Sequence, residues 1–247
     1  MRVIVRIDIK NDFVIKGINL EGLRKIGDPK TIIKKYYNSG IDEIIIIDSV
    51  ASLYGRNNLF NFIKEITKEV FVPITLGGGI RNFKDIENAL NSGADKVAIN
   101  SKALEEPNFI KEASNRFGSS TIISYIEAKK RDQNNWEPYK FCGRERSFIN
   151  LKDWIKTIQD SNCGEILLTS IDQEGTQKGL DLNLFKEVNN LIHIPIILSG
   201  GCGSLEDIEE FNSLYPSEAL AIASALHYSI LEISQIKKSI NEKNNNS

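Results

Sequence analysis

A set of short segments recurs in the same order about half a chain length apart, which strongly limits the folds open to this sequence. The recurring pairs are residues 7–10 and 126–129, residues 43–48 and 165–170, and residues 78–87 and 200–209. The offset is 119 residues for the first pair and 122 residues for the other two. A nearly constant offset indicates two homologous halves, so each structural and chemical feature should arise twice, at positions related by an approximate two-fold axis.

Short apolar runs alternate with longer amphipathic stretches along the chain. The strand candidates are residues 3–9, 43–48, 70–76, 96–100, 121–128, 165–170, 194–199 and 219–223. The helix candidates are residues 29–39, 57–69, 82–91, 107–117, 151–160, 182–190, 205–213 and 232–243. Because each pair of parallel strands needs a crossover connection, eight strand–helix units indicate a parallel sheet. Two halves of four units favour an α/β fold closed into one (β/α)8 TIM barrel over an open doubly wound sheet.

The totals fit one large domain. The chain has 247 residues, of which 41% are hydrophobic, and barrels of this class commonly reach about 250 residues as a single unit. We expect one domain over residues 1–240, with halves of about 1–120 and 121–240, followed by a polar tail at 241–247. A net charge of −2 gives no overall attraction for nucleic acid, so no nucleic-acid partner is expected.

The cysteines and the apolar runs do not indicate a secreted or membrane protein. The three cysteines, Cys142, Cys163 and Cys202, have no regular spacing, which argues against a disulfide framework and a zinc site. Residues 1–12 have charges at short intervals, unlike a signal peptide, and no apolar run approaches the length of about 18 residues that a membrane helix needs. We therefore expect a cytoplasmic protein with no metal and no membrane partner.

Two acids close the first and fifth predicted strands, which stand opposite each other in an eight-stranded barrel. Active sites of such barrels lie at the C-terminal ends of the strands, where Asp8, Asp48 and Glu127 are expected. Two carboxyls that face one cavity can act as general acid and general base on opposite sides of a substrate. Asp8 and Glu127 are therefore the candidate catalytic pair. The alternative is that both are merely solvated acids at strand ends.

Two glycine segments follow the third and seventh predicted strands and precede helices. Residues 77–79 and 199–201 let the backbone approach an anion, and the helix start behind each presents free N–H groups. Each segment alone usually marks a tight turn, but the pair predicts two phosphate sites across one barrel mouth. The next strands end in small polar residues that add donors. The residues assigned to the two sites are Gly79, Asn100, Ser101, Gly201, Ala223 and Ser224.

The predicted ligand is elongated, with a phosphate at each end and its reacting centre between the two acids. Residues 10–28 form a long connection on the same face, and loops of this length there are often mobile lids. Lys16 in this loop either covers a phosphate or is merely solvated. His193 precedes a buried strand and His227 lies at a helix start, so structural roles are expected for both.

Several segments resemble the cyclase subunit of imidazole glycerol phosphate synthase, a family from histidine biosynthesis. The resemblance runs from residue 2 to about residue 238, and its most specific segments are residues 14–17, 27–29, 76–81, 93–96, 117–119, 164–170 and 172–176. In this family the acids that match Asp8 and Glu127 act as acid and base without a metal or organic cofactor. We assign the remaining site residues as follows: Lys16, Glu174 and Gly175 to the phosphates, and Arg6, Asp48 and Thr169 to the substrate cavity.

The resemblance implies a cyclisation fed by a partner protein. A bisphosphate-bearing aminoimidazole carboxamide ribonucleotide would react with ammonia to give imidazole glycerol phosphate and aminoimidazole carboxamide ribotide. The ammonia would come from a glutamine amidotransferase (glutaminase) subunit, bound as a heterodimer at the N-terminal end of the barrel, and would pass through its centre. The family's charged gate at that end matches Arg2, Glu43, Lys96 and Glu165. The alternative is an ion-pair ring that only stabilises the barrel floor.

Three residues depart from the family pattern. Glu127 and Glu174 stand where the family has aspartate, and Arg6 occupies a usually small or apolar position. Arg6 lies two residues before Asp8 and shares its inward face, and a buried guanidinium needs an anionic partner, which would be Glu127 or Asp8. Two interpretations are open. The Arg6 charge either attracts the longer Glu127 carboxyl into the position needed for catalysis, or Arg6 is part of a cavity whose shape suits another substrate.

These departures leave two other functions open. One is a divergent cyclase-like barrel that helps to amidate a sugar for surface polysaccharide synthesis, again with ammonia from a glutaminase. The other is a catalytically silent barrel that only activates its glutaminase. The cyclase is the first interpretation because both phosphate sites, Asp8 and the gate residues occur together.

Overall fold

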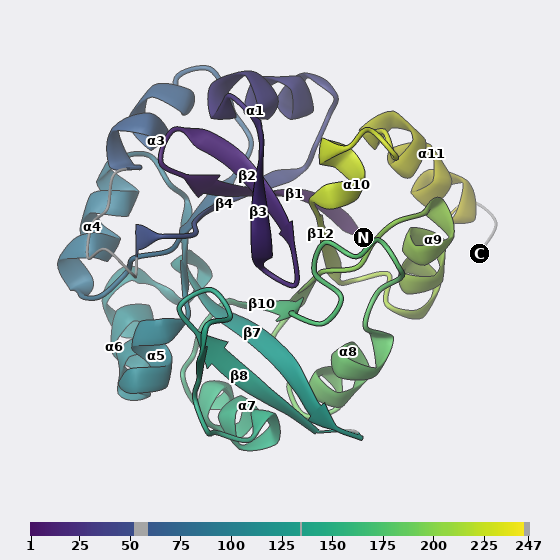
Figure 1. Cartoon of the computed structure of the whole chain (residues 1–247). Coiled ribbons are helices and arrows are strands. Elements are labelled where there is room, and N and C mark those ends of the chain that lie inside the picture. The colour runs from purple at the N-terminus through teal and green to yellow at the C-terminus, as the bar shows by residue number, and fades with distance from the viewer. Residues whose placement is uncertain (52–58, 134, 245–247) are drawn as a thin grey trace.

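Eight parallel strands pair side by side in a closed ring, with helices around them (Figure 1). The computed structural model describes residues 1–51, 59–133 and 135–244. β7 pairs with β10 and β12 pairs with β1, which closes the ring and confirms the predicted (β/α)8 barrel. In ring order the strands are β1 (Arg2–Lys10), β4 (Glu43–Asp48), β5 (Ile74–Gly77), β6 (Lys96–Ile99), β7 (Ile122–Asp132), β10 (Glu165–Ser170), β11 (Ile196–Ser199) and β12 (Ala219–Ile222).

The described helices follow the strands along the chain. They are α1 (Pro29–Asn38), α3 (Phe60–Ile66), α4 (Phe83–Asn91), α5 (Ser101–Glu105), α6 (Asn108–Phe117), α7 (Leu151–Gln159), α8 (Leu182–Asn189), α9 (Leu205–Leu214), α10 (Ser224–His227) and α11 (Ile233–Asn244). Residues 57 and 58 of the helix predicted at 57–69, and residues 245–247 of the predicted tail, lie outside the described residues. Across the described part of the chain, none of the helices combines the length and apolar character that crossing a membrane requires.

Local sequence signals set the helix starts near the barrel mouth. α1 begins at Pro29, and the Asp28 carboxylate accepts a hydrogen bond from the Thr31 backbone N–H. Proline suits this position because its missing N–H would be unpaired there in any residue. α9 begins after Ser204, which exchanges side-chain-to-backbone hydrogen bonds with Asp207. The helix behind the second glycine segment therefore starts at a fixed place.

Each strand buries both of its faces. On β1, Val5 and Ile7 face outward into the main core between strands and helices. Ile4 faces inward and packs against apolar residues of other strands in a second cluster inside the barrel. Because side chains alternate along a strand, Arg6 and Asp8 also point into the barrel, above Ile4.

Two antiparallel hairpins add strands that the sequence pattern does not predict. β2 (Phe13–Ile18) and β3 (Glu21–Gly27) lie within the predicted lid loop. β7 runs on to Asp132 and pairs with β8 (Asn135–Lys140), which pairs with β9 (Glu145–Arg146). The polar sequence of residues 129–135 predicts a loop at a strand end, which is wrong for residues 129–132 and 135 because they belong to β7 and β8. Residue 133 lies in a turn, and residue 134 lies outside the described residues. Lys130 pairs across the strands with Trp136 and lies over its ring, a stabilising contact that hydrophobic periodicity does not register.

Two strands begin at least two residues later than predicted, and in both a proline comes immediately before the first strand residue. β5 begins at Ile74 after Pro73, and β11 begins at Ile196 after Pro195. Proline has no N–H to donate to a neighbouring strand, so Pro73 and Pro195 only accept a hydrogen bond through their carbonyl oxygens. The strand itself starts at the residue that follows each proline.

Candidate functional site

The C-terminal ends of the strands open onto one face of the barrel, and the β2–β3 hairpin lies across that opening (Figure 1). β2 pairs with the end of β1, where Asp8 lies opposite Ile15. Lys16 follows Ile15 and is only 3% exposed. The hairpin therefore places a lysine among the groups at the strand ends.

Asp8 lies in a buried network of four charges. Its Oδ1 accepts a hydrogen bond from Arg6 Nε at 2.9 Å, and its Oδ2 accepts one from Lys16 Nζ at 3.1 Å. Lys16 also forms an ion pair with Glu174, in the loop after β10. Burial alone would raise the pKa of Asp8, but Arg6 and then Lys16 lower this pKa to about 2. Asp8 is therefore ionised at neutral pH, and it is the anionic partner expected for Arg6.

Arg6 spans the interior of the barrel. Its Nη1 donates to Thr169 Oγ1 on β10 at 2.9 Å, and its Cζ lies 5.6 Å from the centre of the Tyr125 ring on β7. Burial would lower the pKa of this guanidinium, but Asp8 raises it above the usual arginine range. Arg6 is 1% exposed, so a permanent cation is enclosed just below the acids.

Glu127 is held by neutral groups. Its Oε1 accepts a hydrogen bond from the Tyr125 hydroxyl at 2.8 Å. Its Oε2 accepts from Asn100 Nδ2 at 2.8 Å and from the Gly143 backbone N–H at 3.1 Å. Burial raises the pKa of Glu127, although Arg6 and Tyr125 act in the opposite direction. Tyr125, rather than Arg6, makes the direct contact below this carboxyl.

Tyr125 is a site residue that the sequence analysis does not identify. It lies two residues before Glu127, as Arg6 lies two residues before Asp8. Both residues point into the barrel from the layer below their acid. Tyr125 follows Arg6 by 119 residues, the offset that also separates Glu127 from Asp8. This offset could have identified Tyr125 as a site residue, because Arg6 was assigned to the cavity.

The turn between β8 and β9 also reaches the site. Phe141, Cys142 and Gly143 have φ angles of 53°, 55° and 73°, all in the left-handed region. The Phe141 N–H donates to Ser101 Oγ at 2.9 Å, while the Gly143 N–H donates to Glu127. These bonds hold two non-glycine residues in a conformation that such residues rarely adopt. No sequence signal that we used points to this turn.

The first predicted phosphate set comes together beside Glu127. Gly78, Gly79, Asn100 and Ser101 line a cavity of about 30 Å³ that Glu127 also lines. Gly78 has a φ of 88°, and a Cβ there would collide with the backbone at the end of β4, so a larger residue does not fit. Asn100 Oδ1 is buried and has no hydrogen-bond partner among the described residues. A ligand hydroxyl or N–H can satisfy this oxygen.

The second predicted set is more dispersed. Lys16 and Gly175 line a cavity of about 620 Å³ between the β2–β3 hairpin and the loop after β10, together with Arg24 and Tyr228. Ser224 begins α10, and its Oγ is buried with no partner in the described part of the structure. A hydroxyl without a partner can donate to an anion, as the prediction for Ser224 requires.

Gly201 and Ala223 lie at the ends of the two strands beside this set. Gly201 has a φ of 95°, and its carbonyl accepts the Gly179 N–H at 3.0 Å. Ala223 is the N-cap residue of α10, immediately before Ser224. The backbone at Gly201 is therefore folded against the loop after β10, at the same rim of the barrel.

Asp48 has bonds to its own turn. Its Oδ1 accepts hydrogen bonds from the backbone N–H groups of Val50 at 3.1 Å and Ala51 at 2.9 Å. A carboxylate that caps the chain after a strand in this way shapes the local turn. These contacts explain the buried acid at this strand end without a ligand.

The space around the two acids is small in this conformation. Asp8 lines a cavity of about 20 Å³ and Glu127 lines one of about 30 Å³, and Cys142 lines both. Each cavity has room for about one water molecule. An elongated bisphosphate needs far more space. The β2–β3 hairpin lines the cavity at Asp8, and Cys142 of the β8–β9 turn lines both cavities, so these two segments would have to move before such a ligand could reach the acids.

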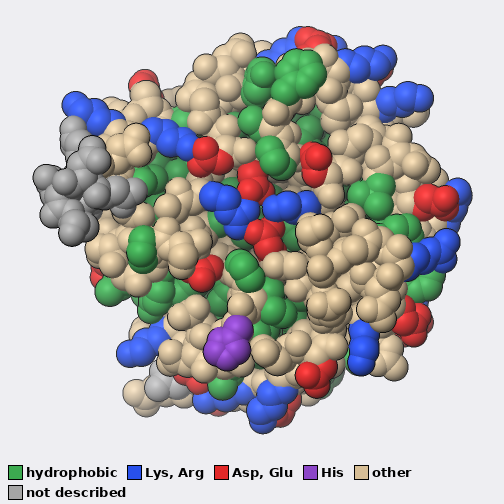
Figure 2. Space-filling model, turned by 180° about the vertical axis from the view of Figure 1, so that it is seen from behind, with side chains coloured by type: hydrophobic (Ala, Val, Ile, Leu, Met, Phe, Trp, Pro, Cys, Tyr) green, Lys and Arg blue, Asp and Glu red, His purple; other side chains and the backbone are tan. Residues whose placement is uncertain are grey.

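The four residues predicted as a gate are joined at the opposite end of the barrel. Arg2 forms ion pairs with Glu43 and Glu165, and Lys96 binds the same two carboxylates at 3.2 and 2.7 Å. Figure 2, which looks at the molecule from behind the barrel mouth, shows acidic and basic side chains gathered near the centre of the face. The ring closes the N-terminal end of the barrel interior. This arrangement is expected both for an ammonia gate and for an ion-pair ring that only stabilises the barrel floor.

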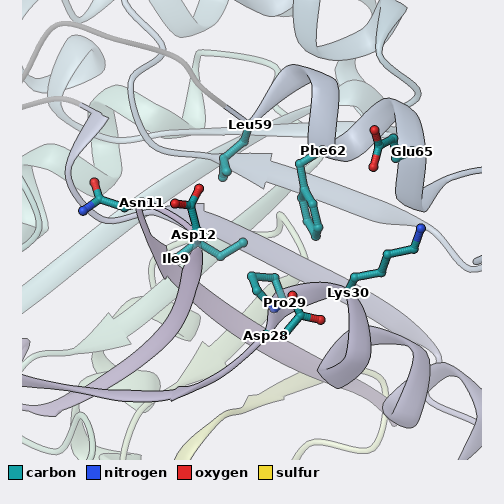
Figure 3. Close-up of a pocket in the computed structure, with 9 residues that line it drawn as sticks. All are labelled: Ile9, Asn11, Asp12, Asp28, Pro29, Lys30, Leu59, Phe62 and Glu65. Carbon is teal, nitrogen blue, oxygen red and sulfur yellow. The ribbon is translucent and has the colours of Figure 1, made fainter.

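A larger cavity of about 610 Å³ lies apart from the acids (Figure 3). Its lining comes from the β1–β2 turn, α1 and the α3 region, and includes Asp12, Lys30, Phe62 and Glu65. Asp28 also lines it but serves as the cap of α1. The cavity shares no lining residue with the two small cavities at the acids, so we do not assign it to the candidate site.

His227, on α10, forms hydrogen bonds to residues of α1 and β1. Its Nδ1 shares a hydrogen bond with the Tyr36 hydroxyl at 2.8 Å, and its Nε2 contacts the Arg6 carbonyl oxygen at 3.1 Å. Burial, reinforced by Lys16, lowers the pKa of His227 to about 4. A neutral imidazole that joins α1, α10 and β1 fits the structural role expected for it, and His193 is exposed.

Comparisons with known proteins agree on one family. The family model described as histidine biosynthesis protein matches residues 2–232. The chain is 50% identical to the imidazole glycerol phosphate synthase subunit HisF of Legionella pneumophila, over 86% of this chain and 99% of that protein. It is 41% identical to the protein of the same name from Lactococcus lactis subsp. lactis (strain IL1403), over 98% of this chain and 94% of the relative. The corresponding protein of Streptococcus mutans is 38% identical over 98% of this chain and 96% of its own length.

Proposed function

The chain belongs to the histidine biosynthesis protein family, and we propose that it works as the cyclase subunit of imidazole glycerol phosphate synthase. The reaction joins ammonia to a bisphosphate-bearing aminoimidazole carboxamide ribonucleotide. It closes the imidazole ring and releases imidazole glycerol phosphate, aminoimidazole carboxamide ribotide and one molecule of water, which carries away the carbonyl oxygen that ammonia replaces. The observation that carries the proposal is the pair of buried acids at the strand ends, Asp8 and Glu127, in a chain so similar to HisF proteins.

In this function the two acids act as acid and base on the substrate that lies between them. One phosphate lies at Gly79, Asn100 and Ser101, and the other lies at Gly201 and Ser224. The unpaired Ser224 hydroxyl supports a phosphate at its end, because it can donate a hydrogen bond, and the unpaired Asn100 Oδ1 supports a donor group of the ligand near the other end. No metal or organic cofactor takes part in the proposed reaction.

The β2–β3 hairpin controls access in the proposed cycle. Lys16 binds Asp8 and Glu174 in the closed arrangement, so these bonds must break when the substrate enters. The Lys16 ammonium is then free to contact a phosphate of the substrate when the hairpin returns. Gly175, which lines the same cavity as Lys16, provides backbone beside that phosphate.

We further propose a heterodimer with a glutaminase subunit that docks on the N-terminal face. Ammonia released there would pass the ring of Arg2, Glu43, Lys96 and Glu165 and enter the apolar interior of the barrel. The inner cluster that begins above this ring is formed by apolar side chains such as Ile4, which do not retain ammonia by hydrogen bonding. The relatives' shared name as a synthase subunit supports a second protein in the complex.

The purified chain, supplied with the bisphosphate substrate and an ammonium salt, tests the cyclase activity without a partner. We expect imidazole glycerol phosphate in the product mixture. Glu127→Gln should form it at least about 100-fold more slowly, whereas Glu65→Gln, which changes an exposed glutamate on α3, should behave like the unchanged protein. Absence of the product with the unchanged, folded protein would reject the proposal.

One observation favours a second candidate function. Arg6 and Tyr125 occupy interior space directly below the acids, and Arg6 stands where the family usually has a small or apolar residue. A substrate cavity whose floor is changed by these two side chains fits a cyclase-like barrel that helps to amidate a sugar during surface polysaccharide synthesis. Growth of a histidine auxotroph that lacks the cyclase separates the two functions, because only the histidine-pathway enzyme restores growth without histidine.

We also propose that the protein works in the cytoplasm. Cys142, Cys163 and Cys202 are free thiols, and the last two are buried. A reducing compartment keeps such thiols unpaired.

A further inference from the structure

Arg6 and Tyr125 stand in equivalent places below the two acids. Each lies two residues before its acid on the same strand and therefore on the same inward face. Tyr125 follows Arg6 by 119 residues, the offset that also separates Glu127 from Asp8. Each donates a hydrogen bond to its own acid, at 2.9 Å for Arg6 Nε and 2.8 Å for the Tyr125 hydroxyl. The two acids therefore have supports in matching positions.

The two supports differ in charge. Asp8 is bound directly by two cations, Arg6 and Lys16. Glu127 is bound directly by three neutral donors: a hydroxyl, the Asn100 amide and the Gly143 backbone N–H. An acid between two cations holds its negative charge firmly, whereas an acid among neutral donors gains and loses a proton more easily.

We propose that Tyr125 is a positioning residue that prepares Glu127 to give a proton to the substrate as the acid, while Arg6 keeps Asp8 ionised as the base. This inference rests on the proposed function, because it divides the acid–base work between the same two residues. It also explains how Glu127 can replace the aspartate that the family has at this position. The Tyr125 hydroxyl on Oε1 and the donors on Oε2 hold both oxygens of the longer side chain.

The charges around Glu127 agree with this division. Burial raises its pKa, and the groups that face it are Arg6 and Asp8 from β1, Tyr125 from its own strand, and Cys142 from the β8–β9 turn. Arg6 lowers the pKa of Glu127 and Asp8 raises it. The hydrogen bond from Tyr125 also lowers it, so removal of that hydroxyl should raise the pKa of Glu127.

Tyr125→Phe tests the inference, because it removes the hydroxyl and keeps the ring against Arg6. Tyr139→Phe is a matched control: Tyr139 is also buried and lies opposite Glu127 on β8, but its hydroxyl accepts from Arg131 Nη1 at 3.0 Å instead of donating to Glu127. With ammonium as nitrogen source, we expect kcat of Tyr125→Phe to fall about tenfold, as for one lost hydrogen bond to a reacting acid. KM should stay unchanged, and the limb of the kcat–pH profile that belongs to Glu127 should move to higher pH.

A second measurement does not depend on turnover. In protein labelled with ¹³C at the glutamate carboxyls, the Glu127 signal can be assigned through its absence in Glu127→Gln and followed by NMR as pH changes. Its midpoint should rise in Tyr125→Phe and stay in place in Tyr139→Phe. An unmoved midpoint and pH profile, or equal effects of the two variants, would overturn the inference. A raised midpoint in a protein that makes no imidazole product would instead reject the proposed function and leave the positioning role standing.

Discussion

Replacement of Lys16 by methionine should release the β2–β3 hairpin from the barrel mouth. The Lys16 ammonium binds Asp8 and Glu174 together and is buried, so it joins the hairpin to two parts of the barrel. Methionine keeps much of the apolar stem but leaves the buried Glu174 carboxylate without its cation. Asp8 keeps its bond to Arg6. The closed hairpin therefore loses stability relative to an open form in which water solvates Glu174.

The structure sets bounds on this effect. Removal of one partner from a buried ion pair costs about 3–5 kcal/mol. The cost cannot much exceed that of protonating the abandoned carboxyl, which for an ordinary glutamate is about 3.7 kcal/mol at pH 7 and about 1 kcal/mol at pH 5. Opening should therefore become roughly 100-fold to 500-fold more favourable at pH 7, but only about fivefold at pH 5. The effect weakens as pH falls, because protonation relieves the unpaired charge.

Hydrogen exchange measured by mass spectrometry on peptides from residues 13–27 reports this opening. Lys25→Met is the matched control, since Lys25 is an exposed lysine on the same hairpin. It loses only a surface contact with the Phe13 ring, worth about 0.5–1 kcal/mol, so its hairpin should exchange at most about fivefold faster than that of the unchanged protein. The reasoning is refuted if Lys16→Met exchanges at the rate of the unchanged protein at pH 7, or if the ratio of the two rates is equal at pH 5 and pH 7. Equal loss of protection in β12 would also refute it, because that would report global destabilisation.

Three further predictions concern the two ends of the barrel. Lys96→Met removes two of the ion pairs of the floor ring. Synthesis driven by glutamine and the glutaminase should then fall about tenfold or more, while synthesis driven by an ammonium salt stays unchanged. A comparison of the two turnover rates tests this. Glu127→Gln should lower ammonium-driven kcat by about 100-fold to 10,000-fold and leave substrate binding measurable by calorimetry; turnover near that of the unchanged protein would exclude Glu127 from proton transfer. Ser224→Val should raise KM about tenfold through one lost hydrogen bond to a phosphate with little change in kcat, and an unchanged KM would place the second phosphate elsewhere.

The barrel could be predicted from the sequence because its strands are short, apolar and evenly spaced. The strands at residues 43–48 and 165–170 agree with the prediction at both ends, since every side chain in them is apolar except near the termini. The β2–β3 hairpin has no such pattern: Lys16, Arg24 and Lys25 interrupt it. Its buried lysine is stabilised by acids elsewhere in the fold, so the local sequence cannot reveal the pairing.

The site was predictable in its positions but not in its contacts. Strand-end placement is a local property, so Asp8 and Glu127 could be assigned to the mouth, and the alternation of a strand put Arg6 below Asp8. The bond between Lys16 and Glu174 joins residues 158 positions apart, and no spacing rule reports it. The Gly143 donor depends on a left-handed turn that contains no motif, only a set of backbone angles.

The layer formed by Arg6 and Tyr125 affects both proposed steps of the reaction. It lies between the floor ring and the acids, so ammonia on the proposed route would reach this layer before it reaches the substrate. The same two side chains hold Asp8 and Glu127, and the bond from Arg6 to Thr169 extends across the interior. A change that opens the route at this layer must therefore also disturb an acid. If ammonia takes the proposed route, its passage and the state of the two acids therefore depend on the same two side chains.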